Sequence, residues 1–105
     1  MAWLSLFVAG VLEVAWAAGL KRLGISPTWI VAALTLIAMI ASLVALHAAM
    51  TRLPLGIAYP IWTGIGSVGS VLISVLFFNQ SLSSTGFVGL ILLVLGMFLL
   101  GSDGH

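Results

Sequence analysis

Cysteine is absent from this chain of 105 residues, and charged side chains are scarce: three basic and two acidic residues make up 5% of it. Without cysteine there is no disulfide framework, no thiol chemistry and no cysteine metal site. A net charge of +1 without a basic patch argues against nucleic-acid binding. Because 63% of the residues are hydrophobic, five charges could not cover the surface of a soluble domain, and we predict an integral membrane protein.

Catalytic and cofactor motifs are also missing. No nucleophile stands beside a base, and no glycine-rich phosphate or dinucleotide motif is present. His47, near the end of an apolar stretch, has no second ligand that would make a metal site or a catalytic dyad. We therefore predict that the protein is not an enzyme and that it needs neither metal nor cofactor.

Four long apolar stretches make up most of the chain, and short breaks with charges, prolines or serines separate them. Crossing a hydrocarbon core of ~30 Å takes about 20 helical residues. We predict an all-α fold with one domain over 1–105 and both termini on one face of the membrane. Its four short transmembrane helices are expected at approximately 2–21, 29–50, 56–78 and 84–101.

Glu13 is the only acid inside these stretches, and it lies in the middle of the first one. A carboxylate near the centre of a spanning helix costs roughly 2.5–3.5 kcal/mol on insertion scales. No Lys or Arg lies inside any of the four stretches, so no fixed partner is evident. We interpret Glu13 as a site whose partner comes and goes, either a proton or a small cation.

Helical spacing places further candidates near Glu13. Gly10 and Trp16 lie three residues before and after it, on one face of the helix. Gly10 is expected to leave open space beside the carboxylate, and Trp16 to bring an indole donor within reach. The alternative for Trp16 is a ring that faces lipid.

Other polar and aromatic residues lie in the second and third stretches. Ser42 is near the centre of the second, and Tyr59 and Trp62 share a broad face of the third. Two aromatic rings near a buried acid can form a cation box, although plain packing is the commoner role of such residues. Ser42 could instead bond only its own backbone.

Glycines suggest motion or close packing. Gly64 and Gly66 follow Pro60, which removes a backbone donor, so we predict a hinge in the third helix. The alternative is that these glycines only let helices approach closely. Gly89 and Gly96 lie one heptad apart in GLILLVLG, a spacing that favours helix–helix packing between subunits. Glycine is also simply frequent in membrane helices.

The chain resembles the small multidrug resistance family of four-helix transporters from Met1 to about Gly101. The likeness rests on the overall length, the mid-helix Glu13, the Leu20–Lys21 ending and the block LPLGIAYPIWTGIG at 53–66. Pro60 stands where the family usually has alanine. The resemblance implies an antiparallel, dual-topology dimer in the bacterial inner membrane, which exchanges cations for protons at a site shared by two glutamates.

Within the family, the chain is most similar to the guanidinium exporters. The pointers are Trp16 directly after Glu13-Val14-Ala15 and the WTGIG run from Trp62. This resemblance implies that Gly10, Trp16, Ser42 and Trp62 line the site and bond or orient the glutamate. It also implies that Tyr59 lies close by at the substrate portal.

Alternatives remain open at this stage. Two basic residues on one face against one on the other leave open whether the chain inserts one way or both ways. The substrate could be a bulky quaternary ammonium or aromatic cation rather than guanidinium, although Trp16 takes up the room for it. The dimer could pair two different chains. A non-transporting assembly or regulatory subunit, with Glu13 facing a partner helix, is the alternative from another class.

Overall fold

Four helices make up the structure, a computed structural model that describes residues 2–103. Met1, Gly104 and His105, which belong to the predicted 1–105 domain, lie outside the described residues. Each helix is long and apolar enough to cross a membrane, so the all-α membrane fold class is confirmed. The helices are α1 (Ala2–Ile25), α2 (Trp29–Met50), α3 (Leu55–Phe77) and α4 (Ser84–Asp103).

Helix α1 runs past the predicted end at 21 because Lys21 and Arg22 do not break it. Both are good helix formers whose long side chains can reach the headgroups from inside a helix. The amide of Ser26 still bonds the carbonyl of Arg22 at 2.8 Å. Pro27 then ends the helix, because the residue before a proline avoids the helical conformation.

The other helix ends have local causes as well. Thr28 caps α2, and its hydroxyl accepts the amide of Val31 at 3.3 Å. Asn79 takes a left-handed backbone conformation (φ 57°) after α3, which asparagine tolerates better than most residues. Before α4, the hydroxyl of Ser83 accepts the amide of Gly86 at 3.3 Å.

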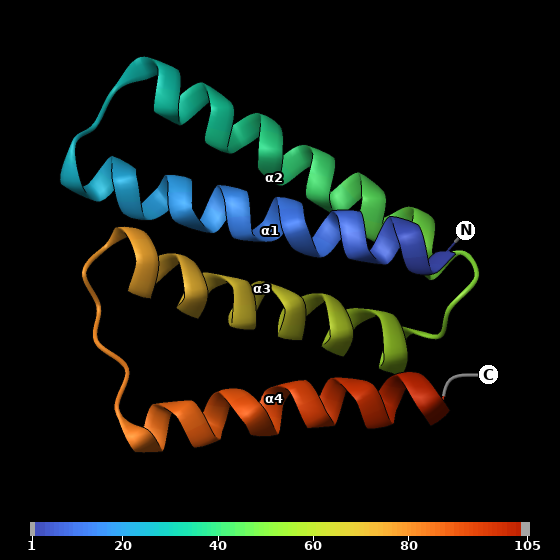
Figure 1. The fold of residues 1–105 in the computed structure, drawn as a ribbon. Helices are drawn as coiled ribbons and strands as arrows, with labels where there is room; N and C mark the ends of the chain where they lie inside the picture. Colours follow the sequence, from blue (N-terminus) through green and yellow to red (C-terminus); the bar gives the residue numbers. More distant parts are fainter. Residues whose placement is uncertain (1, 104–105) are drawn as a thin grey trace.

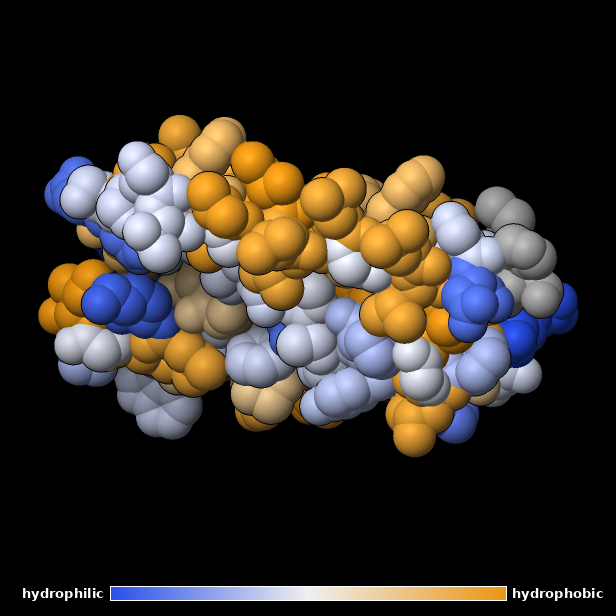
Figure 2. Space-filling view, turned by 90° about the horizontal axis from the view of Figure 1, so that it is seen from below, coloured by the Kyte–Doolittle hydropathy of each residue, from blue (hydrophilic) through white to orange (hydrophobic). Residues whose placement is uncertain are grey.

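The molecule is flat, with extents of 43 × 35 × 16 Å. α2 lies on α1, α1 on α3, and α3 on α4, and both described ends of the chain lie on the side of the α2–α3 loop (Figure 1). α1 and α3 run in the same direction, because each begins on that side. The most hydrophilic residues lie toward the two ends of the molecule and apolar ones between them (Figure 2), as a spanning protein requires.

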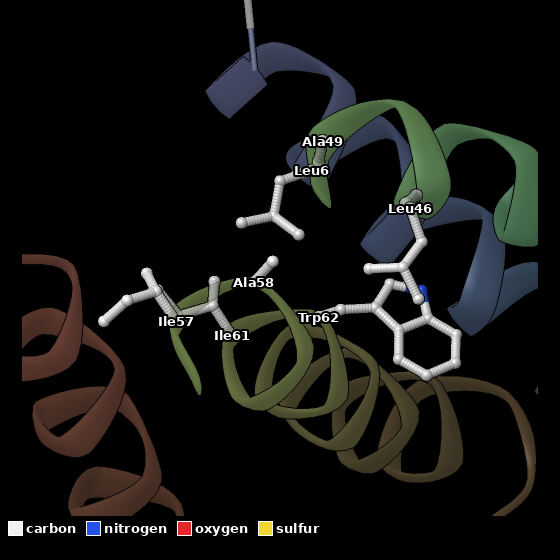
Figure 3. Packing of buried hydrophobic residues seen from close by; sticks show 8 residues of the cluster. Leu6, Leu46, Ala49, Ile57, Ala58, Ile61 and Trp62 are labelled. Atoms are coloured by element: carbon white, nitrogen blue, oxygen red, sulfur yellow. The ribbon is translucent and has the colours of Figure 1, made fainter. Parts of the chain in front are cut away.

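Most of the tight packing lies at one end of the bundle, near the α2–α3 loop. Eight buried residues from α1, α2 and α3 form the cluster there (Figure 3): Leu6, Ala9, Leu46, Ala49, Ile57, Ala58, Ile61 and Trp62. Helix α4 contributes no buried residue. Its backbone packs along α3 alone among the described helices, and Trp3 of α1 reaches it only near Gly101. The first three helices therefore form the stable unit that positions Glu13.

Candidate functional site

Glu13 lies in the middle of α1 and presses its carboxyl group against α3. It is half-buried, and a side chain in place of Gly66 would collide with its carboxyl oxygen Oε1. Gly66 thus provides the room in which the carboxyl group lies. Within residues 2–103, the buried Oε1 has no hydrogen-bond partner. Leaving a buried acceptor unpaired costs about 1–3 kcal/mol, which a bound donor would relieve.

Trp16 lies one helical turn beyond Glu13, and it lacks a hydrogen-bond acceptor where Glu13 lacks a donor. Its buried indole Nε1, a donor, is likewise unpaired among residues 2–103. A carboxylate acceptor and an indole donor therefore stand unsatisfied on one helix face, which is where the sequence placed them. Most buried polar groups in proteins are paired, so two unpaired ones a turn apart mark the strongest candidate for a ligand site.

Ser42 and Trp62 form a hydrogen-bonded chain that ends on α1. The indole Nε1 of Trp62 donates to the hydroxyl of Ser42 at 3.2 Å, and that hydroxyl donates to the carbonyl of Ala9 at 2.7 Å. Ser42 is fully buried and Trp62 nearly so, with its ring directed toward α2 (Figure 3). The chain joins α3, α2 and α1 through their interior.

This chain of bonds ends on a main-chain carbonyl of α1 and not on the Glu13 carboxyl group, and of the two roles that the resemblance implied, bonding or orienting the glutamate, it favours the second. Ala9 is four residues before Glu13, so in a continuous α-helix its carbonyl also accepts the Glu13 amide. Ser42 and Trp62 therefore fix the turn of α1 that carries the carboxylate. No sequence signal marked Ala9, because every residue carries the same carbonyl and only packing selects one.

Gly10 is closely packed, where the sequence suggested open space beside the carboxylate. The side chain of Ile65 fills the position over Gly10, and a Cβ there would collide with it. The physical reason is that α1 and α3 cross closely at this level, so an apolar side chain takes the volume that the glycine leaves. Gly10 thereby sets how near α3 can come to the turn before Glu13.

The glycines of α3 also accommodate particular neighbours. Gly64 is buried under the sulfur of Met97 from α4, and Gly66 under the carboxyl group of Glu13. Helix α3 is continuous over Leu55–Phe77, with Pro60 inside it. Close approach thus accounts for both glycines in this conformation, and the hinge stays a prediction.

Tyr59 lies beside Trp62 but faces outward. The two ring centroids are 5.4 Å apart with planes tilted by 45°, and Tyr59 is 50% exposed. It lines a groove of about 620 Å³ between α3 and α4. Gly89 and Gly96 line the same groove, and each has open space where a side chain would stand. Tyr59 is thus at the outer edge of the aromatic pair, away from the core.

Comparison with known proteins agrees with these features. Residues 1–93 match the family described as Small Multidrug Resistance protein. A protein of Salmonella typhimurium and one of Citrobacter freundii, both named Guanidinium exporter, are each 40% identical over 105 residues, the full length of both chains. A Guanidinium exporter of Proteus vulgaris is 41% identical over 97 residues, which cover 92% of this chain and 93% of that protein. The chain is thus similar to bacterial exporters over nearly its whole length.

Proposed function

The chain belongs to the small multidrug resistance family, and from this premise we propose that it exports guanidinium across the bacterial inner membrane in exchange for protons. The homologues are exporters by name, which favours a transporter over an enzyme. The observation that carries the proposal is the unpaired carboxyl oxygen of Glu13, one helical turn from the unpaired indole donor of Trp16, in the middle of a membrane helix.

Guanidinium suits this arrangement chemically. It is flat and delocalised and carries several N–H donors, two of which can bond a carboxylate side by side. An indole ring attracts a cation placed over its face. Glu13 would supply the acceptor and the negative charge, and Trp16 would frame the plane of the ion and limit its size. Trp62 would orient the turn of α1 that carries Glu13, through its bond to Ser42, and Tyr59 would stand outside it at the substrate portal.

Competition for one carboxyl group provides the coupling. Glu13 holds either a proton or the cation, so loading one releases the other. In an antiparallel dimer the Glu13 residues of both subunits would face one shared binding site and titrate as a coupled pair. Exposure of that site first to one membrane face and then to the other, with α3 bending at Gly64 and Gly66, would complete the exchange. At lower pH the apparent affinity for guanidinium should fall, because protons occupy its acceptor.

Currents from proteoliposomes that contain this chain alone test the proposal. Perfusion with guanidinium should give a current in the wild type and none in Glu13→Gln, because the amide cannot exchange a proton for a cation. Asp103→Asn is the matched control, since it removes the other acid of the chain, in the last turn of α4, and should transport normally. Proton-coupled transport that persists in Glu13→Gln would refute the proposal.

A second perfusion separates the rival functions. Tetrapropylammonium is bulky and has no N–H donor, so it should give no current if Trp16 and Glu13 form a guanidinium site. A current with tetrapropylammonium alone would assign the protein to multidrug export. Folded protein that is silent with both cations, and binds neither, would indicate a missing partner chain or a role outside transport.

A further inference from the structure

Two helices in contact at Glu13 continue side by side toward one face of the membrane. α1 and α3 run parallel and pack against each other (Figure 1). The carboxyl group of Glu13 lies over Gly66, and one residue further along Val14 lies over Gly69. Residues one and two helical turns beyond Glu13 and beyond Gly66 are therefore expected on the sides of α1 and α3 that form this seam.

Four-residue steps along the seam give small and polar residues. From Glu13, α1 continues with Ala17 and Lys21, and from Gly66, α3 continues with Ser70 and Ser74. Steps of four keep to one side of a helix. These residues lie between the candidate site and the face that carries the α1–α2 loop.

The structure contains a hollow at this seam. It measures about 100 Å³ and is lined by Ala17, Lys21, Ser70 and Ser74, together with Val14, Ala18, Ile73 and Phe78. Ala17 and Ser70 lie one helical turn beyond Glu13 and Gly66, so the hollow begins about one turn from the Glu13 carboxyl group, which does not itself line it. A hollow of this size has space for a few water molecules, each of which takes ~30 Å³ in the liquid, and Lys21, Ser70 and Ser74 supply polar groups to its otherwise apolar lining.

Ser70 and Ser74 differ in their surroundings from Ser67, the serine that precedes them in α3. Ser67 donates its hydroxyl to the carbonyl of Thr63 at 2.8 Å and lines the groove on the α4 side. Ser70 and Ser74 are half-buried and line the α1 side. A serine hydroxyl can donate and accept at once, so it can hold water in a hydrogen-bonded chain.

We propose that Ser70 and Ser74, with water between them, form the path by which protons move between Glu13 and the membrane face at Lys21. A proton passes along hydrogen bonds without moving a molecule through the hollow. Guanidinium must travel as a whole ion, and two larger grooves, of about 470 Å³ beside α1, α2 and α3 and of about 620 Å³ between α3 and α4, offer it far more room. This inference rests on the proposed exchange, because it assigns separate routes to the two ions of one site.

Few charged groups bear on this path. Lys21 lines the hollow at its outer end, and Arg22 lines the neighbouring groove between α1, α2 and α3. Tyr59, near the start of α3, and His47, in the last turn of α2, lie toward the opposite end of the molecule. Lys21 is exposed, so headgroup water and salt screen its charge. The two hydroxyls are therefore the groups through which the path can be altered without placing or removing a charge.

Proton uptake by Glu13 can be measured directly in lipid nanodiscs, without guanidinium. A pH jump followed by time-resolved infrared spectroscopy reports the protonated carboxyl band, which Glu13→Gln identifies by its loss. In the double variant Ser70→Ala, Ser74→Ala this uptake should slow by about tenfold, the change expected for one hydrogen bond lost from a rate-limiting path. Ser67→Ala removes a hydroxyl on the other side of the same helix and should leave the rate unchanged.

Equilibrium binding distinguishes a path from a general defect. The double variant should bind guanidinium with wild-type affinity, because neither serine donates a hydrogen bond to the Glu13 oxygen Oε1. Ser74→Leu, which fills the hollow, should slow proton uptake as well. Equal uptake rates in wild type, double variant and Ser74→Leu would overturn the path, whatever the substrate is. Slow uptake in the double variant together with absent guanidinium transport in the wild type would support the path and overturn the proposed function.

Discussion

Glu13 shows how one neighbour can decide where a membrane carboxylate lies. Its position follows from the space over Gly66, whereas its isolation from basic residues is evident in the sequence. The sequence could therefore predict that Glu13 is functional, because an acid in a spanning helix is costly unless a proton or a cation neutralises it. It could not predict the role of Gly66, because the hydrophobic pattern does not specify the register between two helices.

Gly66→Ala should therefore impair the site more than the fold. The new methyl group would occupy the place of Oε1, so the Glu13 side chain must move, and guanidinium affinity should fall by about tenfold, or ~1.4 kcal/mol. Calorimetric titration of the purified protein measures this. Gly69→Ala is the matched control. Gly69 lies one turn beyond Gly66, and its new methyl group would meet the apolar side chain of Val14 instead of the Glu13 carboxyl group. Equal losses in both variants would show that only helix packing was disturbed.

At the same scale, Gly10 and Ser42 show the limits of spacing arguments. Spacing correctly put Gly10 on the face of Glu13, but Ile65 of another helix fills the space beside it. Ser42 could be placed near the centre of its helix, yet its partner is the carbonyl of Ala9, 33 residues away. Both outcomes depend on how α1 packs against α2 and α3. The residue types alone do not determine which residues of two helices come into contact.

Among the elements, the four helices were predictable because each apolar run is about one membrane thickness long and polar or proline-containing breaks bound it. The ends were less predictable. Charges at Lys21 and Arg22 suggested the end of the first helix, but helix propensity and long side chains carry α1 on to Ile25. A proline after a helix was a better stop signal here than a charge.

Helix α4 differs from the others because none of its residues is buried. Gly89 and Gly96 face open space along the groove that it forms with α3. This leaves a surface of small residues on which a second copy could pack closely. The packing of two chains through α4 stays a prediction, as does the dimer itself.

Replacing both glycines of α4 tests that prediction. In Gly89→Ile, Gly96→Ile the new Cβ atoms have open space among residues 2–103, so the fold should hold while the dimer dissociates at least about tenfold more readily. Single-molecule photobleaching in dilute liposomes counts the subunits. Gly56→Ile is the control, because it also points into open space but lies in the first turn of α3. A dimer that survives the double substitution would exclude α4 as its interface.

On the scale of the whole molecule, the two membrane faces differ by a single basic residue. Lys21 and Arg22 lie toward the face with the α1–α2 and α3–α4 loops, and Arg52 and Asp103 toward the face with the α2–α3 loop (Figure 1). Orientation in bacteria follows the basic residues near the helix ends, and two against one is a weak bias. Insertion in both orientations is therefore the expectation for this chain.

One added lysine should strengthen that bias. Gln80→Lys, in the α3–α4 loop, should bring nearly all copies into the orientation with this loop in the cytoplasm. Because the chain has no cysteine, Ser83→Cys and Ser102→Cys give single labels for the two faces. An impermeant reagent should label both in the otherwise unchanged chain, and only Ser102→Cys once Gln80→Lys is added. Labelling of one face alone without the lysine would disprove dual insertion.

The isolation of α4 also bears on how the protein is made. The buried cluster draws on α1, α2 and α3 only, so it can close as soon as α3 has entered the membrane. Chains fold from the N-terminus while the ribosome is still adding residues. The last helix would then arrive at a finished three-helix body and remain available to a neighbour. During synthesis, the folding of one chain would thus precede its association with a second chain.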